Sequence, residues 1–162
     1  MLTINETYYY VLIEFPSSTV LRYADQVFFD LQLAGYQPVI VHPERNKQII
    51  EQPHLLYSLV KYGVFSQLTA GSISGGFGKK IQRFSHQLLG HNLIHIVATD
   101  AHNISTRGFC LTDSYEVVKN GFGSDMLFLL SENAEDVIKG RVLAAEPPEN
   151  VKKQKFLAYF KV

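Results

Sequence analysis

Six residues of this sequence are candidates for binding metal ions and phosphate groups. Carboxylate oxygens and imidazole nitrogens suit manganese, zinc or iron, and a carboxylate can bridge two such ions. Arginine binds phosphate oxygens in bidentate fashion and stabilises charge that develops during group transfer. The metal-ligand candidates are Glu14, His42, Asp100 and His102, and the candidates for catalysis and substrate binding are Arg45 and Arg107. If these side chains converge, they predict a metal-dependent enzyme that acts on a phosphoester.

The metal-ligand candidates lie at the ends of nearly unbroken apolar runs. The runs cover residues 8–13, 37–41 and 93–98, and they end at Glu14, at His42 and at the Asp100 and His102 pair. In parallel α/β folds, active sites gather at the C-terminal ends of the strands. Asp100 and His102 are two residues apart, so both would face the same side of an extended segment. We therefore expect these donors to meet at one edge of a parallel sheet.

A structural role is the alternative for each of these residues taken singly. Glu14 alone would more often form a salt bridge with a helix arginine, and one Asp-x-His pair is more often loop structure than a metal site. Arg45 and Arg107 follow the candidate histidines by three and five residues, and either one alone is compatible with a solvated surface position. The combination of four donors and two arginines favours the metal and phosphate interpretation.

Strands and helices are expected to alternate along most of the chain. Apolar runs predict strands at residues 8–13, 37–42, 64–69 and 93–98. Helical spacing predicts helices at 20–34, at 49–62 with a break or kink at Pro53, and at 79–89, whereas the glycines between 71 and 78 predict a loop. Three short helices are expected after Arg107, at 111–119, 124–130 and 134–139. The alternation predicts an α/β fold with a parallel sheet, either a barrel segment or an open doubly wound sheet.

The composition argues against several other functions. Fifteen Lys and Arg residues balance fifteen Asp and Glu residues, so no excess positive field favours nucleic acid or anionic lipid. The single cysteine, Cys110, excludes an internal disulfide and a thiolate zinc cluster, and it fits a reducing, cytoplasmic setting. The apolar stretch at 8–15 is too short to span a bilayer and contains Glu14. The glycine-rich segment 71–80 does not match an ATP-binding P-loop.

The other histidines are assigned to different roles. His91 and His95 lie at the start of the last predicted strand, opposite the candidate site, and are expected to be structural. His54 and His86 fall within predicted helices and are expected to face solvent.

Several segments of the chain resemble motifs of a known family, in the same order along the sequence. The segments are Val11–Pro16, His42–Asn46, Gln67–Ser72 and Thr99–Asn103, with further similarity at Phe122–Ser124 and Glu132–Asn133. They look like motifs of the CpsB/YwqE-type tyrosine-protein phosphatases, which belong to the PHP (polymerase and histidinol phosphatase) superfamily. Four ordered motifs are far more specific than any one of them.

The resemblance implies a distorted, TIM-like β/α barrel and a manganese-preferring multinuclear centre. Residues 1–146 would form the C-terminal part of such a barrel, ending in short helices, and residues 147–162 would form a tail. The implied activity is hydrolysis of phosphotyrosine on bacterial tyrosine kinases that govern capsule or exopolysaccharide synthesis. By position, Glu14 resembles the bridging carboxylate; the further ligands are His42, Asp100 and His102, and the phosphate-binding residues are Arg45 and Arg107.

The chain departs from the family in one respect. The family begins with a His-x-His strand and an Asp-Asp-Gly segment that bind metal, and this sequence has neither. We therefore expect an incomplete metal cluster, impaired activity, and an unpaired edge on the first strand that favours a homo-oligomer. Two alternatives stay open: a non-catalytic binding or oligomerising module, and a PHP phosphoesterase that acts on small molecules.

Overall fold

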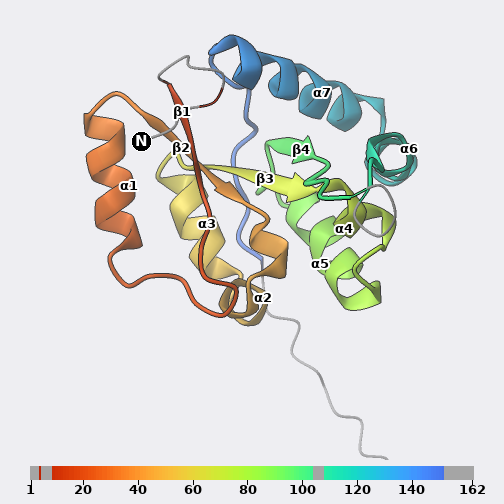
Figure 1. Cartoon of the computed structure of the whole chain (residues 1–162), viewed down its shortest axis with the longest axis horizontal. Helices are drawn as coiled ribbons and strands as arrows, with labels where there is room; N and C mark the ends of the chain where they lie inside the picture. Colours follow the sequence, from red (N-terminus) through yellow and green to blue (C-terminus); the bar gives the residue numbers. More distant parts are fainter. Residues whose placement is uncertain (1–3, 5–8, 104–107, 152–162) are drawn as a thin grey trace, which may run out of the picture.

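Four parallel strands form one sheet in the computed structural model, which describes Ile4 and residues 9–103 and 108–151. The strands are β1 (Tyr10–Ile13), β2 (Gln37–Val41), β3 (Phe65–Thr69) and β4 (Ile96–Ala98), in the order β1-β2-β3-β4 (Figure 1). All three pairings are parallel. The predicted α/β fold with a parallel sheet is therefore confirmed, and the four described strands form an open sheet with β1 and β4 at its edges.

Helices connect the strands and continue beyond the last one. They are α1 (Ala24–Leu33), the 3-10 helix η2 (Pro43–Arg45), α2 (Lys47–Glu51), α3 (His54–Lys61), α4 (Ala70–Ser74), α5 (Lys79–Leu89), α6 (Leu111–Phe122) and α7 (Ser124–Lys139). Figure 1 shows α7 passing beside β4, which it contacts, while α1 flanks the other side of the molecule. None of the helices in the described part of the chain is long and apolar enough to cross a membrane.

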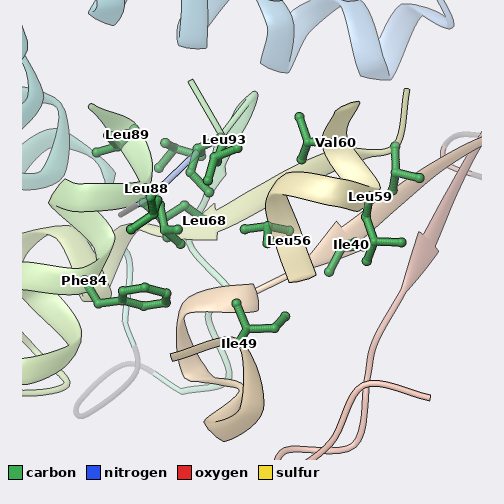
Figure 2. Close-up of a cluster of buried hydrophobic side chains, with 14 of the residues drawn as sticks. Ile40, Ile49, Leu56, Leu59, Val60, Leu68, Phe84, Leu88, Leu89 and Leu93 are labelled. Carbon is green, nitrogen blue, oxygen red and sulfur yellow. The ribbon is translucent and has the colours of Figure 1, made fainter. Parts of the chain in front are cut away.

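The sheet is largely buried on both faces, most completely at β2, which explains the unbroken apolar runs of its strands. Neighbouring residues of β2 point to opposite faces, so Val39 belongs to a small cluster with Ile96 and Val137, while Ile40 belongs to the main core. Figure 2 shows part of that main core, in which the side chains of α3 and α5 pack against Ile40 and Leu68. The strand ends are therefore held by a rigid scaffold.

The helix predictions are partly right. The predicted break at Pro53 is confirmed, because α2 ends at Glu51 and α3 begins at His54. The predicted loop at 71–78 is wrong over its first half, where α4 forms. This helix ends at Ser74 and is capped by Gly75, which has a left-handed conformation (φ 94°). The helix expected at 20–34 begins only at Ala24.

The last two of the three short helices predicted after Arg107 are one continuous helix, α7, and the first extends to Phe122. Asn133 lies between the two predicted helices, and its side chain is fully buried with all of its observed partners in other segments. Its amide nitrogen donates to the carbonyl oxygens of His95 (3.0 Å) and Ala144 (2.8 Å), and its oxygen accepts from the Ala144 N–H (2.9 Å). Tertiary hydrogen bonds therefore override the local preference of asparagine for a helix end.

The segment after α7 returns to the first strand. The Tyr10 hydroxyl donates to the Arg141 carbonyl oxygen (2.6 Å) and accepts from the Leu143 N–H (3.2 Å), and burial raises the pKa of Tyr10 to about 12. Leu143 and Val151 are both buried. The predicted boundary at residue 146 stays a prediction, although the described residues up to Val151 pack against the sheet domain.

Candidate active site

A pocket of about 300 Å³ lies at the carboxyl ends of the strands. Its lining includes five of the six predicted site residues: Glu14, His42, Arg45, Asp100 and His102. The convergence expected from the strand ends is therefore observed for these five. Arg107 lies outside the described residues. The remaining lining residues are Phe15, Ser17, Val41, Pro43 and Asn46.

Glu14 and His42 meet because β1 and β2 are neighbours with Ile13 opposite Ile40. The Nε2 atom of His42 lies 3.2 Å from Oε1 of Glu14, so Glu14 contacts an imidazole and not a helix arginine. The His42 side chain is 17% exposed and that of Glu14 is 69% exposed. Burial, followed by the positive charge of Arg45, lowers the pKa of His42, against an opposing effect of the carboxylates of Glu14 and Asp100. A neutral imidazole is the form that binds metal.

Arg45 and Asp100 form an ion pair across the pocket. Nη2 of Arg45 lies 2.6 Å from Oδ2 of Asp100, and both side chains are about one-fifth exposed, at 20% and 19%. The guanidinium also lies over the ring of Phe77, 5.2 Å from its centroid. Arg45 is therefore held from two sides, which rules out the solvated surface position considered for it.

His102 is oriented by its own loop. Its Nδ1 atom lies 2.8 Å from the carbonyl oxygen of Asp100 and 3.7 Å from the carboxylate atom Oδ1 of the same residue. A carbonyl oxygen can only accept, so Nδ1 carries the proton and donates it to this oxygen. In the neutral form of the ring, this tautomer leaves the lone pair on the other nitrogen, Nε2, as in histidines that bind metal.

Two of the pocket residues have an unusual backbone. His42 (φ 39°) and Asp100 (φ 50°) adopt left-handed conformations, and Asn92 is the third such non-glycine residue in the described ranges 9–103 and 108–151. Side chains rarely tolerate this region, and residues that do so cluster at functional sites. Both residues turn the chain sharply just after a strand, and this turn keeps their side chains at the edge of the sheet.

The loop after β1 is fixed beside His42 by Asn46. The amide nitrogen of Asn46 donates to the carbonyl oxygens of Pro16 (2.8 Å) and Thr19 (3.1 Å), while its oxygen accepts from the Ile49 N–H (3.0 Å) and caps α2. One buried amide therefore joins the segment that follows Glu14 to the segment that follows His42.

Sequence reasoning missed two residues near the pocket, Phe77 and Glu44. Phe77 lies in the glycine-rich segment, where no pattern indicates contact with Arg45. Glu44 directly precedes Arg45 in the sequence, and its side chain is fully buried. Its Oε1 atom accepts from the Ser72 hydroxyl (2.7 Å) and the Thr69 N–H (3.3 Å), and burial raises the pKa of its carboxyl group. The signal available in the sequence was a carboxylate inside the His42–Asn46 motif.

The donors present fit part of a metal site. In a metal centre with bonds of about 2.1 Å, neighbouring donor atoms lie about 3 Å apart, and the Glu14 and His42 atoms, 3.2 Å apart, match this spacing. Within the described part of the chain, however, no group of three or more His, Cys, Asp or Glu side chains is arranged to hold one ion. Asp100 and His102 line the same pocket, and the carboxylate of Asp100 forms an ion pair with Arg45.

The fold and the pocket define an α/β protein whose candidate site combines carboxylates, imidazoles and an arginine at the carboxyl ends of parallel strands. Residues 1–139 match the family described as "Capsular polysaccharide synthesis, CpsB/CapC". The chain belongs to this family, and the resemblance inferred from its motifs is confirmed.

Two relatives illustrate the similarity. The chain is 49% identical over 160 residues to the tyrosine-protein phosphatase YwqE of Bacillus subtilis (strain 168), covering 99% of this chain and 63% of that protein. It is 39% identical over 152 residues to the putative tyrosine-protein phosphatase CapC of Staphylococcus aureus, covering 94% of this chain and 59% of that protein.

A solved structure supports the fold. The matching structure is described under "Crystal structures of YwqE from Bacillus subtilis and CpsB from Streptococcus pneumoniae, unique metal-dependent tyrosine phosphatases". The match has a TM-score of 0.92 at 50% identity and covers 94% of this chain and 62% of that chain. The present chain thus spans less than two thirds of the length of these relatives.

Proposed function

We propose that this chain carries the phosphate-binding and metal-binding pocket of a metal-dependent protein-tyrosine phosphatase. The observation that carries the proposal is the meeting of Glu14, His42, Arg45, Asp100 and His102 in one pocket at the strand ends. Relatives at 49% and 39% identity are named as tyrosine-protein phosphatases, which supports phosphotyrosine as the substrate.

In this proposal the metal ligands are Glu14, His42, Asp100 and His102. When bound there, a divalent cation, manganese by family resemblance, would supply positive charge near the phosphate oxygens and lower the pKa of a water molecule. Glu14 and His42 are already at the spacing of neighbouring ligands. Burial lowers the pKa of His42, which favours the neutral imidazole that binds metal, and the hydrogen bond from Nδ1 of His102 to the Asp100 carbonyl oxygen directs Nε2 as the lone-pair atom of the neutral ring.

Arg45 binds the transferred phosphate group. Its guanidinium is held by Asp100 and by the ring of Phe77, so its position is fixed before the substrate arrives. A pre-positioned guanidinium stabilises charge on the phosphate oxygens without a reorganisation cost at the moment of reaction. Arg107, five residues after His102, is proposed as the second phosphate-binding residue from its place in the motif.

The finer features of the family are also proposals for this chain. The sequential order of the four parallel strands, each joined to the next by helices, suits a segment of a distorted β/α barrel. The physiological substrate would be a phosphotyrosine protein, such as a bacterial tyrosine kinase of capsule or exopolysaccharide synthesis, in the cytoplasm. The edge position of β1 and the 47% exposure of Leu12 on it favour a homo-oligomer.

A phosphotyrosine-peptide hydrolysis assay tests the function. We expect manganese-dependent turnover that a chelator abolishes and added manganese restores, and we expect His42→Ala to abolish it. His54→Ala is the matched control, because His54 is exposed on α3, and this variant retains full turnover. Turnover that persists unchanged in the chelator and in His42→Ala contradicts the proposal.

A non-catalytic binding module is the second candidate. It is favoured by one observation, namely that no three side chains of the metal-binding types are arranged around one ion in the described residues. Stoichiometric binding of the phosphotyrosine peptide without turnover, at any manganese concentration, would support the module. Turnover of small phosphoesters but not of the peptide would instead support the small-molecule phosphoesterase.

A further inference from the structure

The carboxylate of Glu44 is buried directly behind the pocket without lining it. Glu44 is 0% exposed, although a buried carboxyl group is costly unless its position brings a compensating benefit. It forms no ion pair with Arg45 among the described salt bridges, so charge neutralisation alone does not explain it. Its contacts are instead with the backbone and a hydroxyl group of neighbouring elements.

These contacts join three elements that surround Arg45. Glu44 belongs to η2, which is only three residues long and ends at Arg45. Its Oε1 atom accepts from the Thr69 N–H at the end of β3 and from the Ser72 hydroxyl in α4. The chain that follows α4 carries Phe77, whose ring lies under the guanidinium. A single carboxylate oxygen thus fixes both the backbone that bears Arg45 and the helix that precedes its stacking partner.

The hydrogen bonds of Arg45 itself are incomplete. The Nε atom of Arg45 is buried and has no hydrogen-bond partner among the described residues, and the same holds for Glu44 Oε2 and Thr69 Oγ1. Of the guanidinium nitrogens, Nη2 is paired with Asp100. Buried polar atoms without partners persist only where the surrounding structure holds them in place.

We propose that Glu44 is a positioning residue, whose two hydrogen bonds hold η2 against β3 and α4 and thereby set the Arg45 guanidinium for phosphate binding. The inference rests on the proposed role of Arg45. It predicts that Arg45 loses its fixed position when the acceptor at Glu44 is removed, even though Glu44 touches no substrate.

Two substitutions at Glu44 separate the acceptor from the charge. Glu44→Gln keeps a carbonyl oxygen that can accept from Thr69 and Ser72, whereas Glu44→Leu removes both acceptors at a similar volume. Asn133→Leu is the matched control for stability, because it removes a fully buried, hydrogen-bonded side chain in α7, away from η2. Each purified chain is titrated with inorganic phosphate in the presence of manganese. In separate samples without manganese, which is paramagnetic and would broaden the signal, the side-chain Nε–H signal of Arg45 is recorded by NMR, with Arg45→Lys to assign it.

We expect Glu44→Leu to weaken phosphate binding about tenfold or more and to shift or broaden the Arg45 signal, since small misplacements of a binding group cost large factors. Glu44→Gln is expected to stay within about twofold of the unchanged chain in phosphate affinity, because both hydrogen bonds remain. Asn133→Leu is expected to lower the melting temperature without changing phosphate affinity below that temperature. If Glu44→Leu does not fold, Ser72→Ala takes its place, because it removes the hydroxyl that donates to Glu44. We expect Ser72→Ala to cause a smaller loss of phosphate affinity than Glu44→Leu.

The inference is overturned if folded Glu44→Leu, or Ser72→Ala in its place, binds phosphate and shows the Arg45 signal as the unchanged chain does. It is also overturned if Glu44→Gln is as impaired as Glu44→Leu. A failure of the proposed function gives a different result: the unchanged chain then binds no phosphate, or Arg45→Lys leaves the affinity unaltered. In that case the Arg45 signal in the Glu44 variants still shows whether Glu44 positions the guanidinium.

Discussion

Acidification is predicted to destabilise the fold through one buried histidine, His95. Its side chain is 4% exposed at the start of β4, its Nδ1 atom accepts from the Ser66 N–H (3.2 Å), and the ring of Phe65 packs against it (4.9 Å between centroids). Burial lowers the pKa of His95 from 6.5 to about 4. Protonation would place an N–H opposite the Ser66 N–H and a charge in an apolar setting.

The sign and size of the effect follow from the two pKa values. Between pH 6.5 and pH 4 the unfolded chain takes up a proton that folded His95 does not, so the free energy of unfolding falls as the pH falls through this window. The stabilisation is complete above pH 6.5. The loss amounts to about 2 kcal/mol at pH 5 and about 3 kcal/mol below pH 4, a large fraction of the stability of an ordinary domain.

Urea unfolding between pH 4.5 and pH 8 measures this effect. His95→Asn provides the comparison, because its Oδ1 atom can take the place of Nδ1 as acceptor and does not titrate. The difference between the two stability curves is predicted to change by about 2 kcal/mol between pH 8 and pH 5. His54→Asn, at an exposed position, is predicted to leave the curve unchanged. Parallel curves for the unchanged chain and His95→Asn would refute the reasoning.

Three further changes have defined outcomes. Tyr10→Phe removes the hydroxyl that bonds to the Arg141 carbonyl oxygen and the Leu143 N–H. We expect it to lower the free energy of unfolding by about 1–3 kcal/mol in urea titrations, and an unchanged value would contradict this role of the hydroxyl. Gly76→Ala places a methyl group 3.2 Å from the Gly71 carbonyl oxygen, so we expect a lower melting temperature, whereas Ala at Gly121, which has open space, should be tolerated. Arg45→Ala is expected to reduce kcat/KM for a phosphotyrosine peptide about tenfold to a hundredfold, with Arg45→Lys intermediate, and equal kinetics for all three chains would exclude Arg45 from the site.

The sequence predicted the strands and their carboxyl ends well because the central strands are largely buried on both faces. Val39 and Ile40 point into different cores, so β2 reads as a continuous apolar run that ends at His42. The end of such a run marks the carboxyl edge of a parallel strand. The sequence alone therefore predicts that the donors at these ends converge.

The contacts that refine the site could not be predicted, because they join residues distant in sequence. The ion pair of Arg45 with Asp100 spans 55 positions, and the bond between Glu44 and Ser72 spans 28. Asn133 shows the same limit in the fold, since asparagine is common at helix ends but here satisfies carbonyl groups from two other segments. Local patterns report burial and periodicity, whereas these pairings depend on how the elements pack.

The relaxation of the ³¹P nucleus of inorganic phosphate in the presence of Mn²⁺ tests the central claim most directly, namely that the strand-end pocket holds a divalent cation and a phosphate group together. Manganese is paramagnetic, so it broadens the phosphorus signal strongly only when both occupy neighbouring positions. We predict manganese-dependent broadening with the unchanged chain, no broadening above that of free Mn²⁺ with His42→Ala or Arg45→Ala, and full broadening with His54→Ala. Equal broadening in all four chains, or none with the unchanged chain, would contradict the account.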